Sequence, residues 1–149
     1  MKVAIGADHR GYRAKTVIKA MLSELGADVL DFGTESSKPV DYPDPAYAAA
    51  QAVQNRQCDL GILFCGTGIG MSITANKVPG TRAALCHNDF TAEMARRHND
   101  ANVLCMGSRV VDERMVDEIV RRFIRTPFDG GRHTRRIRKI ADAERQGPC

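Results

Sequence analysis

Residues 60–70 decide the expected fold and read Leu60-Gly61-Ile62-Leu63-Phe64-Cys65-Gly66-Thr67-Gly68-Ile69-Gly70. The apolar run Leu60–Phe64 predicts a buried strand, and three glycines in five residues follow it at once. Alternating glycines allow a tight turn and leave several N–H groups directed at one point beside the next helix. This pattern favours a bound phosphate or oxyanion, although a plain tight turn between strand and helix also explains it. Met71 replaces the third glycine of a dinucleotide fingerprint, and a P-loop lysine is absent.

Strands and helices alternate on both sides of this segment. Apolar runs predict further strands at 2–7, 27–32, 82–86 and 102–106. Helical spacing of apolar or alanine residues predicts helices at 14–25, 46–53, 71–76, 88–98, 112–124 and 134–145. Strands separated by helices indicate parallel βαβ units with right-handed crossovers. We therefore expect an α/β protein, a three-layer sandwich around a parallel sheet of about five strands.

The composition places the chain among ordinary globular proteins. It has 149 residues, 43% hydrophobic and 27% charged, which suits one domain over residues 1–149 and argues against disorder. No apolar run approaches the roughly 20 residues of a membrane-spanning helix. The start, Met1-Lys2-Val3, leads directly into a strand-like run without the apolar stretch of a signal peptide. We expect a cytoplasmic protein without a membrane partner.

Cysteine and histidine spacing predicts neither a disulfide framework nor a metal site. The five cysteines are an odd number without a Cys-x-x-Cys pair, so we expect free thiols; they are Cys58, Cys65, Cys86, Cys105 and Cys149. The four histidines lack the paired spacing of zinc ligands; they are His9, His87, His98 and His133. We expect no metal.

Ligands of open parallel sheets bind outside the carboxyl ends of the strands. That rule selects four loops as one rim: Asp8-His9, Cys65–Gly70, His87-Asn88 and Gly107–Arg109. Cys65, beside the glycine amides and a helix start, is either a nucleophile or base, or a buried structural thiol. We place His98-Asn99-Asp100 on the same rim. Each histidine there is either a hydrogen-bonded cap or a catalyst.

The charge is unevenly distributed along the chain. Residues 1–120 carry a balance of −2, and residues 121–149 carry +6, which together give the net charge of +4. Arg132 and Arg136 stand at i and i+4 of the last predicted helix, so they share a face and can clamp one phosphate. Nucleic acid and a merely solvated basic face remain alternatives, but only 5% of the residues are aromatic and no stacking motif supports nucleic acid. Gly130-Gly131 is a plausible hinge for this basic arm, at about 125–149.

A set of motifs that covers nearly the whole chain resembles the family of type B ribose-5-phosphate isomerases and galactose-6-phosphate isomerase subunits. The motifs, in chain order, are Gly6-Ala7-Asp8-His9-Arg10-Gly11, Asp41-Tyr42-Pro43, Cys65-Gly66-Thr67-Gly68-Ile69-Gly70, Ala75-Asn76-Lys77, Arg96-Arg97-His98-Asn99-Asp100, Gly107-Ser108-Arg109-Val110-Val111 and Gly130-Gly131-Arg132-His133. The resemblance implies a Rossmann-like sandwich, a homodimer or a tetramer of dimers, and no metal or organic cofactor. One branch of the family replaces the cysteine with a glutamate after the glycine loop; Met71 there places this chain in the cysteine branch.

The resemblance also implies a role for each matching residue. Cys65 would be the base that moves a proton between C2 and C1, and His98 the acid that opens the furanose ring. Thr67 would relay hydroxyl protons. The remaining residues would bind substrate: Asp8, His9, Tyr42, Asn99, the loop residues Gly66, Gly68, Ile69 and Gly70, and the phosphate ligands Arg109, Arg132 and Arg136. The family's basic arm reaches into the neighbouring subunit's site.

The expected activity is therefore cofactor-independent isomerisation of ribose 5-phosphate and ribulose 5-phosphate through an enediolate, in the pentose phosphate pathway. Two alternatives remain open. One is an isomerase of a hexose 6-phosphate such as allose or galactose 6-phosphate, because the loop cannot measure one extra carbon. The other is a non-catalytic module that binds a sugar phosphate or nucleotide.

Overall fold

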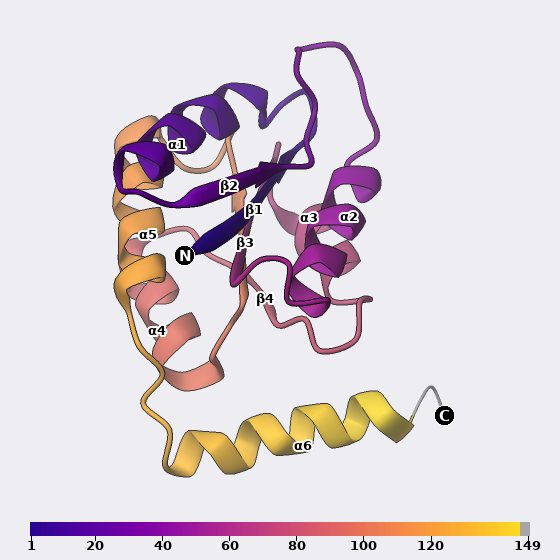
Figure 1. Cartoon of the computed structure of the whole chain (residues 1–149), viewed down its shortest axis with the longest axis vertical. Coiled ribbons are helices and arrows are strands. Elements are labelled where there is room, and N and C mark those ends of the chain that lie inside the picture. Colours follow the sequence, from indigo (N-terminus) through magenta and orange to yellow (C-terminus); the bar gives the residue numbers. More distant parts are fainter. Residues whose placement is uncertain (147–149) are drawn as a thin grey trace.

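A computed structural model describes residues 1–146 of the chain, so Cys149 and the end of the predicted arm lie outside the described residues. Five parallel strands form one sheet in the order β2-β1-β3-β5-β4 (Figure 1). Their bounds are β1 Lys2–Ala7, β2 Asp28–Asp31, β3 Leu60–Cys65, β4 Ala83–Leu85 and β5 Val103–Gly107. In the centre, Ala7 lies opposite Phe64, and Cys65 opposite Gly107. The predicted α/β class and parallel sheet are confirmed.

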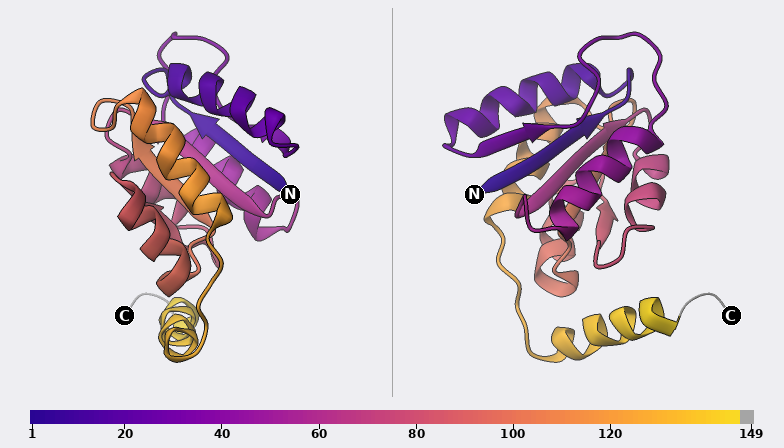
Figure 2. Two further views of the ribbon diagram at one scale, coloured as in Figure 1. Left: turned by 90° about the vertical axis from the view of Figure 1, so that its left-hand side faces the viewer. Right: turned by 45° about the vertical axis from the view of Figure 1, so that its right-hand side comes forward.

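Helices cover both faces of the sheet, as Figure 2 shows. Three of them enclose one apolar core with residues such as Ile18, Ile119 and Phe123; they are α1 Tyr12–Glu24, α4 Asp89–Asn99 and α5 Glu113–Arg125. Two others enclose the second core; they are α2 Pro43–Gln54 and α3 Ile69–Ala75. These layers confirm the predicted sandwich. No helix among residues 1–146 is long and apolar enough to span a bilayer.

Four helices (α1, α2, α3 and α6) begin two or three residues earlier than the sequence predicts, and two of these earlier starts bear on the site. Helix α2 starts at Pro43 rather than residue 46, because proline is well suited to the first turn, where its missing N–H has no intrahelical acceptor. Helix α3 starts at Ile69 rather than residue 71, so the last two residues of the glycine motif are already helical. The amides of the motif consequently belong to the positive end of α3.

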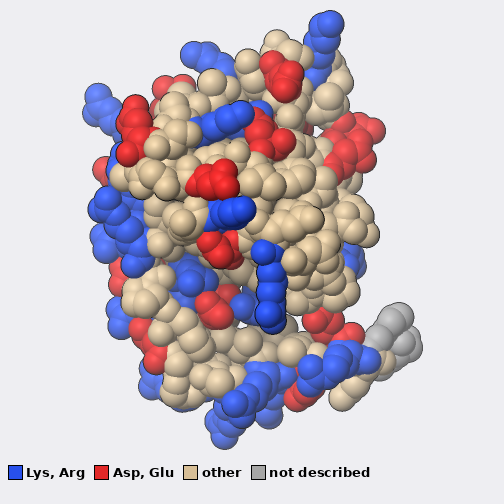
Figure 3. Space-filling view, in the orientation of Figure 1, with Lys and Arg blue, Asp and Glu red and all other residues tan. Residues whose placement is uncertain are grey.

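Helix α6, Arg132–Gln146, lies outside the sandwich (Figure 1). Its only residue that is buried is His133. Asp129, which precedes α6, holds the start of the helix: its carboxylate lies 3.1 Å from Nε of Arg97 in α4. Farther along, the Glu144 carboxylate accepts the Gly80 amide at 2.9 Å. Lysine and arginine side chains line the visible side of α6 in the space-filling view (Figure 3).

Candidate active site

The glycine loop connects β3 to α3 at the carboxyl edge of the sheet. Gly68 has φ +78°, in the left-handed region that side chains other than glycine's rarely adopt. A Cβ there would also lie 2.5 Å from Leu85 Cδ1 and 2.8 Å from the Met106 carbonyl carbon. This close approach turns the loop back over the end of β5 and directs the Gly68 amide toward Cys65.

Cys65 ends β3, and its side chain faces this loop. The Gly68 N–H donates to its Sγ at 3.1 Å, and only 5% of the residue is exposed. An N–H directed at sulfur stabilises negative charge on it. Burial raises the pKa of three other thiols: that of Cys58, that of Cys86 to about 11, and that of Cys105 well above its ordinary range. These three thiols stay protonated at neutral pH.

The loop after β1 brings acid and basic groups to the same edge. Asp8 is 5% exposed, and its Oδ1 accepts the amides of Arg10 and Gly11, each at 2.9 Å. Its carboxylate is thereby fixed at the start of α1. The His9 ring lies farther out, with Nδ1 3.3 Å from the backbone of Val40.

Two arginines flank the first glycine of the loop. A Cβ on Gly66 would lie 3.1 Å from Cδ of Arg10 and 3.8 Å from Cδ of Arg109. The Arg109 amide donates to the Gly66 carbonyl at 3.1 Å, and Ser108 Oγ donates to the Arg10 carbonyl at 2.8 Å. Arg109 was predicted as a site residue, but Arg10 was not. Arg10 directly follows the predicted rim loop Asp8-His9, and this position could have identified it as a site residue.

Tyr42 and Thr67 complete this edge. The Tyr42 ring lies directly against Gly70, where any Cβ would overlap it, and the residue is 42% exposed. The exposed Thr67 accepts the Ile69 amide on Oγ1 at 3.4 Å. The carboxyl edge thus carries a thiol, a carboxylate, amides and two guanidinium groups around one glycine loop.

The prediction that His98 and Asn99 lie on the same rim as Asp8 is wrong. Helix α4 starts beyond the carboxyl end of β4 and runs antiparallel to the strands, so its last residues reach the amino edge. There the Asn99 carbonyl accepts Nε of Arg82, which precedes β4, at 3.0 Å. In one chain, His98 and Asn99 are therefore at the opposite edge of the sheet from Cys65.

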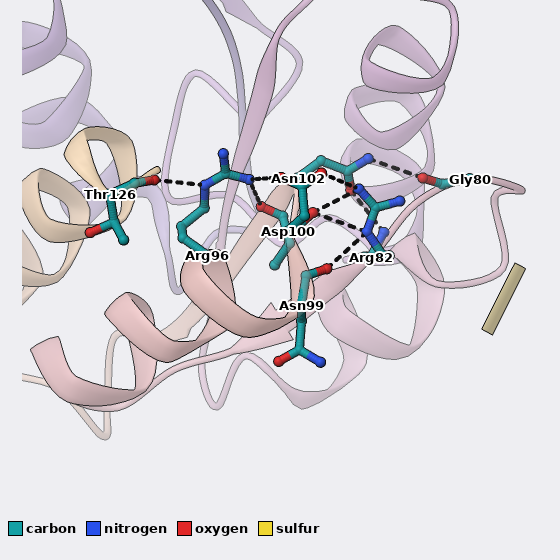
Figure 4. A network of polar contacts seen from close by, with 8 residues as sticks. Gly80, Arg82, Arg96, Asn99, Asp100, Asn102 and Thr126 are labelled. Carbon is teal, nitrogen blue, oxygen red and sulfur yellow. Dashed lines mark hydrogen bonds and ion pairs between the residues drawn. The ribbon is translucent and has the colours of Figure 1, made fainter. Parts of the chain in front are cut away.

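A polar network fixes this end of α4 (Figure 4). Asp100 adopts φ +43°, and its carboxylate lies between two guanidinium groups, with Arg96 at 2.8 Å and Arg82 at 3.2 Å. Arg82 also binds the Asn99 and Asp100 carbonyls, which have no partners within the helix. The network therefore holds His98 and Asn99 at a defined position.

His98 meets the basic arm at this place. Its ring stacks on that of His133 of α6, with centroids 4.3 Å apart and planes 5° apart. Arg132 precedes His133, and Arg136 follows one helical turn later. The amino edge thus gathers the other predicted site residues, namely His98, Asn99, Arg132 and Arg136.

Three possible metal ligands, His98, Asp129 and His133, also meet here. Residues 98 and 133 are too far apart in sequence for spacing to reveal the pair. The nearly parallel rings direct their nitrogen lone pairs along parallel planes rather than toward one point. Arg97 and Arg132 add positive charge beside them. This arrangement does not fit a cation.

A family model described as Ribose/Galactose Isomerase matches residues 3–140. The chain belongs to this isomerase family. Ribose-5-phosphate isomerase B of Escherichia coli is 45% identical over 97% of both chains. A structure of ribose-5-phosphate isomerase B from Clostridium thermocellum has a TM-score of 0.98, is 48% identical and covers 99% of this chain and 100% of that one. A Mycoplasma genitalium ribose-5-phosphate isomerase B with bound ribulose 5-phosphate has a TM-score of 0.93, is 43% identical and covers 97% of both chains.

The predicted family is confirmed, and the two edges can be compared with what an isomerase of this family needs. Moving a proton between neighbouring carbons requires a base and donors for a developing oxyanion. The carboxyl edge contains both, in Cys65 and the glycine-loop amides. The cationic groups of α6 and the His98 ring lie at the other edge.

Proposed function

We propose that this isomerase interconverts D-ribose 5-phosphate and D-ribulose 5-phosphate through an enediolate, in the pentose phosphate pathway of the cytoplasm. The observation that carries the proposal is Cys65 at the mouth of the glycine loop, with its sulfur 3.1 Å from the Gly68 amide. The E. coli relative has the same activity in its name, and the Mycoplasma relative has ribulose 5-phosphate bound.

Cys65 is the base in this mechanism. Its thiolate takes the proton from C2 of the open-chain aldose, and the thiol returns it to C1, while one proton moves from the C2 hydroxyl to the C1 oxygen. Thr67, exposed beside the loop, relays that hydroxyl proton. Amides from Gly66 to Gly70 hold the enediolate oxygens, and one such donor is typically worth about 10²–10³ in kcat.

The other residues of the carboxyl edge bind the sugar. Asp8, fixed by two amides, and His9 contact its hydroxyl groups, and Tyr42 lines the pocket over Gly70. Arg109 contributes to phosphate binding. Arg10, whose side chain lies closer to Gly66 than that of Arg109, is a second cationic group for the same substrate.

A second copy of the chain completes the site. His98, Asn99, Arg132 and Arg136 lie at the amino edge, out of reach of Cys65 in the same chain. A homodimer, or a tetramer of dimers, in which the amino edge of one chain faces the carboxyl edge of the other would join the two groups. His98 then gives a proton to the furanose ring oxygen as its bond to C1 breaks, and the C1 hydroxyl releases its proton to water. Arg132 and Arg136 bind the phosphate.

Turnover of ribose 5-phosphate, compared with allose 6-phosphate and galactose 6-phosphate, tests the proposal. We expect the pentose phosphate to have the highest kcat/KM. A higher value for either hexose phosphate would instead identify a hexose-phosphate isomerase. Binding of all three without turnover would identify a binding module.

Replacing Cys65 tests the assignment of the base. We expect Cys65→Ala to abolish isomerisation and leave binding of ribose 5-phosphate nearly unchanged, since the thiolate acts on C2 and the phosphate is bound elsewhere. Stopped assays for turnover and calorimetry for binding measure the two effects. Cys58→Ala is the control, because Cys58 is also buried but lies at the amino end of β3. Substantial turnover by Cys65→Ala would contradict the assignment.

Replacing His98 tests ring opening. We expect His98→Asn to reduce turnover of the cyclic substrate far more than proton exchange on an open-chain analogue, because only the cyclic form needs an acid at its ring oxygen. Isotope exchange measured by NMR gives the second rate. Equal losses on both substrates would mean that His98 has another role.

A further inference from the structure

The stacked pair of His98 and His133 joins two elements far apart in the sequence. His98 is half-buried in the last turn of α4, whereas His133, 6% exposed, is the buried residue of α6. The centroid distance of 4.3 Å and the 5° angle mean that one face of the His98 ring is covered by the other ring. The His98 ring therefore cannot rotate without losing this contact.

The His133 ring is itself held in place. Its backbone amide donates to the Gly130 carbonyl at 3.0 Å, and the Asp129 amide donates to the Arg97 carbonyl at 3.0 Å. The Asp129 carboxylate is paired with the Arg97 side chain. Arg132 Nε donates to His133 Nε2 at 3.4 Å, which leaves the ring proton on Nδ1. The start of α6 is thus tied to the end of α4 by contacts other than the stack.

His133 is neutral at pH 7. Burial, and after it the electrostatic effects of His98, Arg132 and Arg136, hold the pKa of His133 below its ordinary value of 6.5, against the opposing effect of Asp129. A neutral ring offers a face without the like-charge repulsion that a second imidazolium would exert on a protonated neighbour. Such a face can lie against His98 in the protonated form that ring opening requires.

We propose that His133 is a positioning residue, whose ring stacks on His98 and fixes the direction in which His98 donates its proton to the furanose oxygen. This inference rests on the proposed function. His133 itself does not contact the sugar in this scheme. Its contribution is the flat ring against His98, so another aromatic ring should replace it.

The test compares two variants of similar size, His133→Phe and His133→Leu. Misplacement of a catalytic group by about 1 Å costs up to roughly 10²-fold, so we expect His133→Leu to lose about tenfold to a hundredfold in kcat on cyclic ribose 5-phosphate. Proton exchange on the open-chain analogue should stay near the wild-type rate, and KM should change little. His133→Phe should retain most of the cyclic turnover. Equal losses on both substrates, or a large rise in KM, would indicate that α6 had simply been displaced and would overturn the proposal.

The His98 Cε1–H resonance gives a readout that does not depend on activity. A stacked aromatic ring shifts that proton, so we expect it to move in His133→Leu and to remain shifted in His133→Phe. A moved resonance with undiminished cyclic turnover would overturn the positioning role and leave the isomerase intact. If the wild-type protein did not turn over ribose 5-phosphate, the proposed function would fail. Independently of activity, a His98 resonance that did not move in His133→Leu would refute the stacking contact.

Discussion

At the scale of single residues, Gly68 connects the fold to the proposed chemistry. Its positive φ and its approach to Met106 make the loop turn back, and its amide then reaches the Cys65 sulfur. Gly26 also has a positive φ, +75°, but a Cβ there would have nothing within 4 Å. A comparison of substitutions at the two glycines therefore separates the cost of a left-handed backbone from the cost of steric overlap.

We expect Gly68→Ala to be much more damaging than Gly26→Ala. Left-handed backbone costs an alanine roughly 1–2 kcal/mol at either position. At Gly68 the overlap with Leu85 and Met106 adds roughly 1–3 kcal/mol and moves the amide away from Cys65. Urea unfolding measures the stability, and kcat should fall only in Gly68→Ala. Equal losses of stability and unchanged kcat in both variants would show that the close approach is unimportant.

Local spacing was sufficient to find Cys65 and the glycine loop, whereas Tyr42 was suggested only by the family resemblance and Arg10 was not predicted. Cys65 follows a recognisable strand and directly precedes three glycines, so strand, loop and helix start are read from one short segment. The contact between His98 and His133 could not be predicted in this way. It depends on where α6 returns to α4, which is set by contacts such as Asp129 with Arg97 rather than by periodicity.

At the scale of elements, the direction of α4 determines where His98 lies. A helix that follows a parallel strand starts at the carboxyl edge and must return to the amino edge before the next strand. Residues in the last turn of α4 therefore belong to the amino edge, whatever their chemistry. The sequence prediction grouped His98 and Asn99 with Asp8 because all are polar residues at the ends of elements, and the direction of the helix separates them.

The docking of α6 should depend on pH through His133. Its pKa is lower in the folded protein than in the unfolded chain, so unfolding takes up a proton as pH falls below about 6.5. The stability is therefore fully present above that pH and decreases toward the folded pKa. The groups facing the ring are His98, Arg132, Arg136 and Asp129.

We expect wild-type protein to lose more stability between pH 7 and pH 5 than His133→Phe, which keeps a buried ring but has no proton to bind. Urea-unfolding midpoints across this range measure the difference. The carboxylate of Asp31, despite burial that raises its pKa, has a pKa below its ordinary value of 3.8 through bonds from Lys15, Lys19 and Gly33. The stability that the Asp31 carboxylate contributes is lost at a lower pH than that of His133, and this loss is the same in both proteins. Parallel pH profiles would contradict a buried neutral His133.

At the scale of the whole molecule, the charge distribution and the positions of the site residues lead to the same arrangement. The slightly acidic body carries Cys65 at one edge, and the basic α6 carries Arg132 and Arg136 at the other. The charge asymmetry was evident from the sequence, but the distance between the two groups follows only from the topology. The proposed shared site would use both halves of the molecule.

Two inactive chains should restore activity when combined. One carries Cys65→Ala and the other carries Arg132→Ala with Arg136→Ala; they are unfolded and refolded as an equal mixture, and each is also refolded alone as a control. In a mixed dimer one site combines both lesions, whereas the other pairs an intact Cys65 with intact arginines of the opposite chain. Half of the dimers are mixed and have one of two sites working, so activity should return to about a quarter of wild type in a two-fold symmetric assembly. If each arm served its own chain, every site would keep a lesion, and the mixture would be no more active than the controls.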